Sequence, residues 1–229
     1  FIDNGPNTLI ITGKFPVSNL TQLNLYPNLI DYARPVFPPI ATVGITTTAG
    51  DISLKSDFVR NGYHVEGENV KVGIISNSYN TDPLNGALTD VQNGDLPGTG
   101  NPDGHLTPVQ VLKEYPYGRQ TDEGRAMLQI VHDIAPKAEL AFRTGFISAG
   151  DFAQGIRQLA QANCDVIVDD VTFITEPFFE DGVVAKAADE VTAAGVSYFS
   201  AAGNYGNKSY SNNFNPVNPP AGVTGKAHD

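Results

Sequence analysis

Five short runs of mostly apolar residues stand out between residues 69 and 203, and more polar segments separate them. The runs that begin near residues 138, 165 and 196 are nearly continuous in apolar residues, which suits strands that are buried on both faces of a parallel sheet. The pattern therefore predicts five strands in one parallel sheet. Their expected positions are 70–75, 108–114, 138–144, 165–171 and 196–202.

Helical signals lie in the segments between these runs. Ser148 followed by Asp151 is an acidic form of a capping arrangement, and it opens a helix with apolar residues on one face. Apolar residues stripe a second helix over 183–191, which Gly195 is expected to close as a left-handed cap. The alternation of strands and helices predicts the α/β class, with a doubly wound parallel sheet and right-handed crossovers.

The first 45 residues follow a different pattern. They contain a short strand-like run, a further helix and strand that need a partner, and the extended proline-rich connector PVFPPI. We therefore predict a small N-terminal appendage over residues 1–45 and an α/β domain over residues 46–229.

The composition and net charge of the chain argue against several classes of binding partner. Apolar residues make up 41% of the chain and charged residues 17%, as in an ordinary globular protein. The net charge of −11 argues against nucleic acid as a partner, because binding its phosphates requires lysine and arginine. No run approaches the roughly 18 apolar residues of a membrane span, so no membrane partner is expected. Nucleotide-binding glycine motifs are absent from the sequence.

Polar residues gather where three of the predicted strands end. In an open parallel sheet, binding and catalytic sites form beyond the carboxyl ends of the strands. The exits of interest are residues 76–78, 169–170 and 203–204. Alternation along a strand sends Asp169 and Asp170 to opposite faces, so only one of them can face a cleft.

Three segments resemble subtilisin-like serine peptidases. They are NVKVGIISNS (69–78), EGRAMLQIVHDIAP (123–136) and VSYFSAAGNYG (196–206), and the likeness extends over roughly residues 55–215. The resemblance implies a subtilisin-like sheet, serine-peptidase activity on a peptide or protein substrate, and a secreted or extracellular location.

Carried over by position, the resemblance assigns roles to single residues. Asn204 falls on the asparagine of the oxyanion hole, where its amide stabilises a developing alkoxide. Glu123 falls on the catalytic histidine and Ser76 on the catalytic aspartate. Glutamate at the histidine position is also found in the related, acid-acting sedolisins, whose next helical turn carries an orienting aspartate. Here that position is Met127, so the chain matches neither pattern fully.

Asp170 is the candidate that replaces the missing orienting group. By the resemblance it lies where the family has a substrate-contacting serine, and two close carboxyl groups raise each other's proton affinity. The alternative interpretations are a helix or turn cap, or a ligand of a structural calcium ion. No other cofactor is expected. We interpret Cys164 as a buried, inert thiol because an apolar strand follows it, His105 as part of a solvated turn, and His132 as a core or surface histidine. Without clustered His or Cys ligands, a transition-metal site is not expected.

The expected nucleophile has no counterpart in this sequence. The family's Gly-Thr-Ser motif is absent from the 25 residues after Asn204. Either the sequence stops short of that motif, or the native protein is cut there, or the remainder belongs to another chain. We expect the serine in the remainder of the polypeptide, downstream of Asp229, and we expect the fragment alone to be inactive. By the resemblance, residues 1–45 are expected to be the remnant of a pro-segment.

Two functions follow from these observations. The first is a subtilisin-like serine endopeptidase domain in which Glu123 is the base, Asp170 orients it and Asn204 supplies the oxyanion donor. The second is a catalytically inactive relative that keeps the fold as a binding or scaffold module. Loss of both histidine and aspartate from their expected positions favours the second, whereas Asn204 and an acidic residue at 123 favour the first.

Overall fold

The fold comes from a computed structural model of the whole chain, and it is described for most residues between 48 and 204 and for short stretches outside that range. The described residues are 2–3, 11–12, 15–30, 33, 48–173, 176–177, 179–204, 207, 213, 215–218, 221 and 227–228. The chain separates into two compact units, Phe1–Thr42 and Val43–Asp229. The predicted boundary after residue 45 and the proline connector lie outside the described residues.

The described residues of the first unit form two short paired strands and one helix. β1 (Ile2–Asp3) pairs antiparallel with β2 (Ile11–Thr12), and a 3-10 helix, η1, covers Val17–Leu25. These strands form a sheet of their own and are not among the strands of the main sheet. Their identity as a pro-segment remains a prediction.

The second unit is built on a five-stranded, all-parallel sheet in the order β4-β5-β3-β6-β7. The strands are β3 (Lys71–Ser76), β4 (Gln110–Lys113), β5 (Glu139–Thr144), β6 (Val166–Asp169) and β7 (Ser197–Ser200). All five predicted strands are present, and the α/β prediction is confirmed. β3 is the central strand, so its carboxyl end opens between those of β5 and β6.

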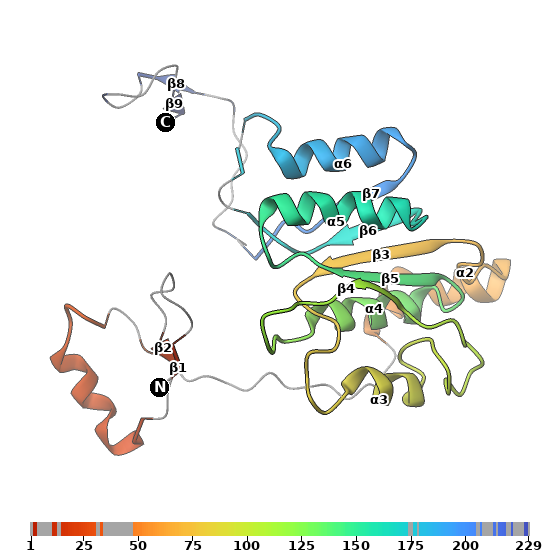
Figure 1. The fold of residues 1–229 in the computed structure, drawn as a ribbon, viewed down its shortest axis with the longest axis horizontal. Helices are drawn as coiled ribbons and strands as arrows, with labels where there is room; N and C mark the ends of the chain where they lie inside the picture. The colour runs from red at the N-terminus through yellow and green to blue at the C-terminus, as the bar shows by residue number, and fades with distance from the viewer. Residues whose placement is uncertain are drawn as a thin grey trace. The chain divides into compact units, whose positions relative to one another are not determined.

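Helices cover both faces of this sheet (Figure 1). The helices of this unit are α1 (Ala49–Leu54), α2 (Ser56–Tyr63), α3 (Gly86–Asn93), α4 (Glu123–Ile134), α5 (Ala149–Gln161) and α6 (Val183–Ala193). α5 and α6 lie on one face, and α3 and α4 lie on the other. The doubly wound arrangement is therefore present. Outside the sheet, β8 (Pro216–Val217) pairs antiparallel with β9 (Ala227–His228).

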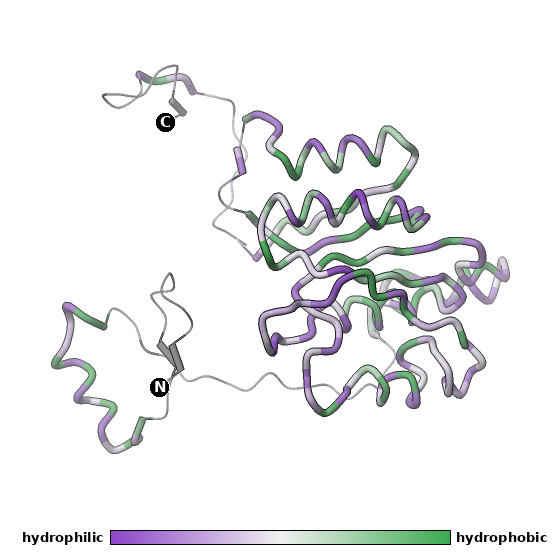
Figure 2. The backbone as a smooth tube through the Cα atoms, viewed as in Figure 1, coloured by the Kyte–Doolittle hydropathy of each residue, from purple (hydrophilic) through white to green (hydrophobic). Residues whose placement is uncertain are grey.

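Two apolar layers fill the space between the sheet and its helices. Ile75 and Ile167 pack with Phe152 and Leu159 of α5 on one side, and Phe142 packs with α4 on the other. Hydrophobic stretches follow the strands, whereas along α5 and α6 they alternate with hydrophilic positions (Figure 2). Burial of one helix face against the sheet is the main stabilising contribution of such a helix.

Helix ends agree with the local signals in the sequence. The hydroxyl of Ser148 accepts a hydrogen bond from the backbone N–H of Asp151 at 3.2 Å, which caps α5. Gly195 follows α6 with a φ of 98°, the left-handed conformation expected of a closing glycine. No helix in the described part of the chain is long and apolar enough to cross a membrane.

Candidate active site

The site begins at the carboxyl end of β3, where three polar residues follow one another in a buried position. Ser76 is the last residue of the strand, and Asn77 and Ser78 come directly after it; all three are at least 95% buried. The backbone carbonyl of Ser76 accepts a hydrogen bond from Gly145 at 2.8 Å, which fixes this exit against the end of β5. We call residues 76–78 the β3 exit.

Two acidic residues from different elements meet beside the β3 exit. Glu123 is the first residue of α4, and Asp170 directly follows β6. Their carboxyl groups form a hydrogen bond with each other, which requires a proton on one of the two. The Ser76 hydroxyl donates to Oδ2 of Asp170 at 3.1 Å. The structure thus brings Glu123 and Asp170 together, and adds Ser76 to them.

The surroundings favour protonation of this acid pair. Partial burial raises the pKa of Glu123, and the charge and the hydrogen bond of Asp170 raise it further. Burial also raises the pKa of Asp170, although the hydrogen bond from Ser76 opposes the rise. Because the two groups interact closely, their protons leave in two steps that belong to the pair.

Asn77 holds the backbone at the start of α4. Its side-chain oxygen accepts hydrogen bonds from the backbone N–H of Glu123 at 2.9 Å and of Ser78 at 2.5 Å. Its amide nitrogen donates to the hydroxyl of Thr121. The first N–H groups of a helix have no partner within the helix, so this contact both satisfies one of them and positions Glu123.

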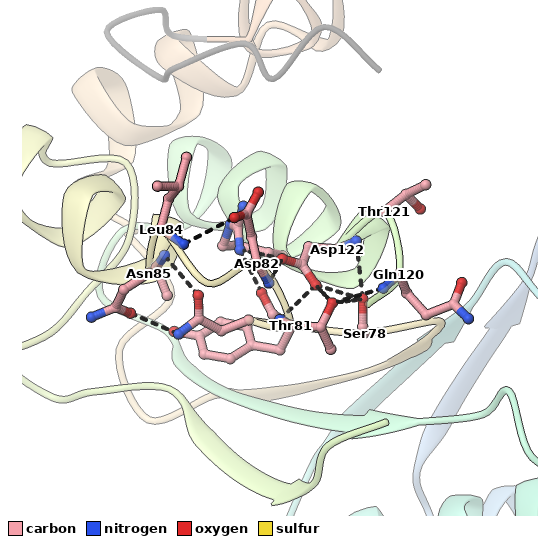
Figure 3. A network of polar contacts seen from close by, with 12 residues as sticks. Ser78, Thr81, Asp82, Leu84, Asn85, Gln120, Thr121 and Asp122 are labelled. Carbon is pink, nitrogen blue, oxygen red and sulfur yellow. Dashed lines mark hydrogen bonds and ion pairs between the residues drawn. The ribbon is translucent and has the colours of Figure 1, made fainter. Parts of the chain in front are cut away.

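Asp122 anchors the same helix start through a network of polar contacts (Figure 3). Its buried carboxylate accepts hydrogen bonds from the hydroxyls of Ser78 and Thr81, each at 2.6 Å, and from Arg125 at 2.8 Å. Burial alone would raise the pKa of Asp122, but these hydroxyls and the Arg125 charge together lower it. Asp122 adopts a φ of 53°, so this anchored carboxylate also sits at a strained backbone position.

The neighbouring acid, Asp169, points elsewhere. Its carboxylate accepts hydrogen bonds from the hydroxyl of Tyr198 at 2.6 Å and from that of Ser200 at 3.1 Å, both on β7. Asp169 and Asp170 therefore serve different neighbours, as strand alternation requires. Asp169 is explained as a buried, hydrogen-bonded group between two strands.

The remaining candidates lie apart from the acid pair. Asn204 is exposed beyond β7, and no hydrogen bond joins it to Glu123 or Asp170 within the part of the chain that the structure describes. His132 is buried against His105, with ring centroids 5.1 Å apart, and burial lowers its pKa to about 4. Burial raises the pKa of the Cys164 thiol to about 11, which makes it unreactive.

A metal site does not emerge from the described residues, which contain no group of three or more His, Cys, Asp or Glu side chains able to hold an ion. The carboxyl group of Asp170, the candidate calcium ligand, forms hydrogen bonds with Ser76 and Glu123. A calcium ion bound there would have to displace these contacts.

Sequence reasoning missed the parts played by Ser76 and Asn77. The resemblance places Ser76 at the position of the family's catalytic aspartate, and it assigns no role to Asn77. The available signal was the run Ser-Asn-Ser at the end of a buried strand, since buried polar side chains need partners. The partners themselves come from residues more than 40 positions away, and only the folded sheet brings them into contact.

Comparison with models of protein families finds no match, and neither does comparison with curated proteins. Among solved structures, the protease domain of PatA, in a mutant form, is similar with a TM-score of 0.42 and 19% identity, over 63% of this chain and 54% of that one. A lanthipeptide protease is similar with a TM-score of 0.47 and 17% identity, over 71% of this chain and 50% of that one. The chain thus spans about half the length of these two structures.

Proposed function

We propose that this chain forms the part of a subtilisin-like serine endopeptidase that carries the general base, with Glu123 as that base. The observation that supports the proposal is the hydrogen-bonded pair of Glu123 and Asp170 at the carboxyl edge of a parallel sheet. A base with a raised pKa at this edge has the proton affinity and the location that general-base catalysis uses.

In the proposed reaction, the nucleophilic serine comes from polypeptide outside these 229 residues. Ionised Glu123 takes the proton of the serine hydroxyl as its oxygen attacks the peptide carbonyl, and then passes that proton to the leaving amine. Asp170 orients the Glu123 carboxyl through their hydrogen bond. The side-chain amide of Asn204 donates to the oxyanion of the tetrahedral intermediate. Water then hydrolyses the acyl ester, again with Glu123 as the base.

The test uses a longer polypeptide that contains the serine, and compares it with the chain described above. We expect peptide hydrolysis and covalent labelling by a fluorophosphonate only in the longer form. E123Q keeps the shape of the side chain but removes the base, so kcat/KM should fall by about 10²- to 10⁴-fold.

Glu139 provides the matched control. It begins β5 at the opposite edge of the sheet, and its side chain is 61% exposed in a weak ion pair with Lys71. E139Q should therefore retain full activity. Retention of activity in E123Q would remove Glu123 from the mechanism and refute the proposal.

The second candidate is a catalytically inactive module that binds peptides or proteins. It is favoured by the presence of Ser76, buried and bound to Asp170, where the family's catalytic aspartate is expected. In that case the longer polypeptide would bind peptides without hydrolysing them, and no serine would be labelled.

A further inference from the structure

The hydrogen bonds around the acid pair are unequal. Asp170 accepts a hydrogen bond from the Ser76 hydroxyl at 3.1 Å in addition to its contact with Glu123. The Glu123 carboxyl, by contrast, has Asp170 as its one hydrogen-bond partner among the residues that the structure describes. Donors stabilise the ionised form of a carboxyl group, so this asymmetry favours the anion on Asp170.

We propose that Ser76 is a positioning residue that keeps Asp170 ionised, so that the proton shared by the acid pair resides on Glu123. This inference deepens the proposed function and rests on it for its catalytic meaning. Ser76 would act through Asp170 and would not touch the substrate. The residue matched to the family's catalytic aspartate thus keeps a role, although it carries no charge.

The position of Ser76 in the sheet explains why its hydroxyl faces Asp170. Ser76 is fully buried at the end of the central strand, and its neighbour in the β3·β6 register, Ile75, pairs with Asp169. Continuing this register by one residue places Ser76 beside Asp170. Its backbone is held by the hydrogen bond from Gly145, and because the residue is fully buried its hydroxyl has no water to bind in place of the carboxylate.

The two acids of the pair also differ in solvent exposure, which determines how accessible their shared proton is. Glu123 is the more exposed of the two residues, and Asp170 is half-buried. A proton on Glu123 is therefore more accessible than one on Asp170 to a group bound at the sheet edge. Two other acids lie next to the pair in sequence, and both have partners of their own: Asp122 binds Arg125, and Asp169 binds Tyr198.

The experiment follows each carboxyl group by NMR in the 229-residue chain, with ¹³C-labelled aspartate and glutamate side chains. E123Q and D170N assign the two signals. As the pH is raised, we expect Asp170 to ionise first and Glu123 to follow in the second step. In S76A the Asp170 titration should move upward by about one pH unit, because a hydrogen bond to an ionised group is lost.

Ser200 offers a closely matched control, because its hydroxyl donates to the adjacent Asp169 at the same 3.1 Å. S200A should shift the Asp169 titration and leave the order of Glu123 and Asp170 unchanged. S76T keeps a hydroxyl and should restore the wild-type order. Amide spectra at neutral pH would establish that each variant is folded.

Two results would overturn the proposal. One is ionisation of Glu123 before Asp170 in the unaltered chain, a measurement that needs no variant to fold. The other is a folded S76A variant whose two titration curves match those of the wild type. Neither result depends on a nucleophile, so the proposed peptidase activity can fail while this inference stands, and the reverse also holds.

Discussion

Asp122 shows how strongly the candidate site depends on individual buried groups. It lies directly before Glu123, and its carboxylate joins the β3 exit to the start of α4 through Ser78 and Arg125. Several donors together offset the cost of burying a carboxylate. When the carboxylate is removed, these donors stay buried without a hydrogen-bond partner, which destabilises the fold. The position of Glu123 is therefore coupled to the stability of this network.

D122A should lower the free energy of unfolding by about 3 kcal/mol or more, because Arg125 and two hydroxyls lose a buried partner. Urea unfolding of the 229-residue chain measures the change. Glu190 is the control, since its ion pair with Arg157 is exposed. E190A should change the free energy of unfolding far less than D122A does, because water screens an exposed ion pair. Equal losses of unfolding free energy in the two variants would show that the Asp122 network stabilises the fold no more than an exposed ion pair does.

The buried side chain of His132 leads to a prediction of how the stability of the fold depends on pH. Its Nδ1 is buried without a hydrogen-bond partner in the described part of the chain, and its pKa is lowered from 6.5 to about 4 by burial and by the charge of His105, against the opposing charge of Asp103. The unfolded chain takes up a proton near pH 6.5, whereas the folded chain does so only near pH 4. Stability should therefore fall as the pH drops through this window, by about 3 kcal/mol from this group.

H132L removes this titration and keeps a buried apolar side chain of similar size. The difference in unfolding free energy between H132L and the wild type should grow in favour of H132L as the pH falls from 6.5 to 4. Comparing the two proteins cancels the opposite contribution of Asp95, whose pKa is raised to about 6 by burial and by the charges of Asp90 and Asp133. A difference that does not change with pH would contradict the assignment.

Among the elements, α4 has the greatest effect on the site, because its first residue is Glu123. Close packing of this first turn depends on Gly124, where a Cβ atom would lie 2.8 Å from the backbone oxygen of Ser78 and would overlap the ring of Phe142. The helix can approach the β3 exit this closely only without a side chain at that position.

G124A should therefore destabilise the fold by more than about 1 kcal/mol, even though alanine is normally the better helix former. Gly150 is the matched control, because it also lies in a first helical turn and a Cβ there would have nothing within 4 Å. G150A should leave stability unchanged or raise it by up to about 1 kcal/mol. Thermal unfolding of the two variants compares them directly, and similar behaviour would refute the packing argument.

The strands and two helix ends could be predicted from the sequence because their signals are local. Runs such as 138–144 are largely apolar, and Ser148 and Gly195 mark the helix ends within a few residues. α1 and α2 were not predicted. Their apolar residues include Ile52, Phe58 and Tyr63, which stay largely exposed, so no buried stripe marks them.

The candidate site was predictable only in part, for the same reason. Glu123 and Asp170 were expected to meet, because both lie at the carboxyl edge of a parallel sheet. The hydrogen bond from Ser76 depends on which strands are neighbours, and strand order is a property of the whole sheet. The oxyanion role of Asn204 and the pro-segment role of residues 1–45 remain predictions.

At the scale of the whole molecule, the proposed function links the acid pair to a serine in polypeptide beyond these 229 residues. In the proposed reaction, Glu123, with its pKa raised by burial and by Asp170, is the general base. A base must be ionised to act, so activity should be lost as the pH falls through its pKa.

The most direct test is the pH profile of kcat/KM for peptide hydrolysis by the longer polypeptide, in the wild type and in D170N. We predict an acidic limb above the ordinary glutamate value of 4.5, because the pKa of Glu123 is raised. In D170N the limb should move to lower pH, since the charge and the hydrogen bond that raise this pKa are removed. A limb that stays at the same pH in D170N would contradict the assignment of Glu123 and Asp170 as one acid pair.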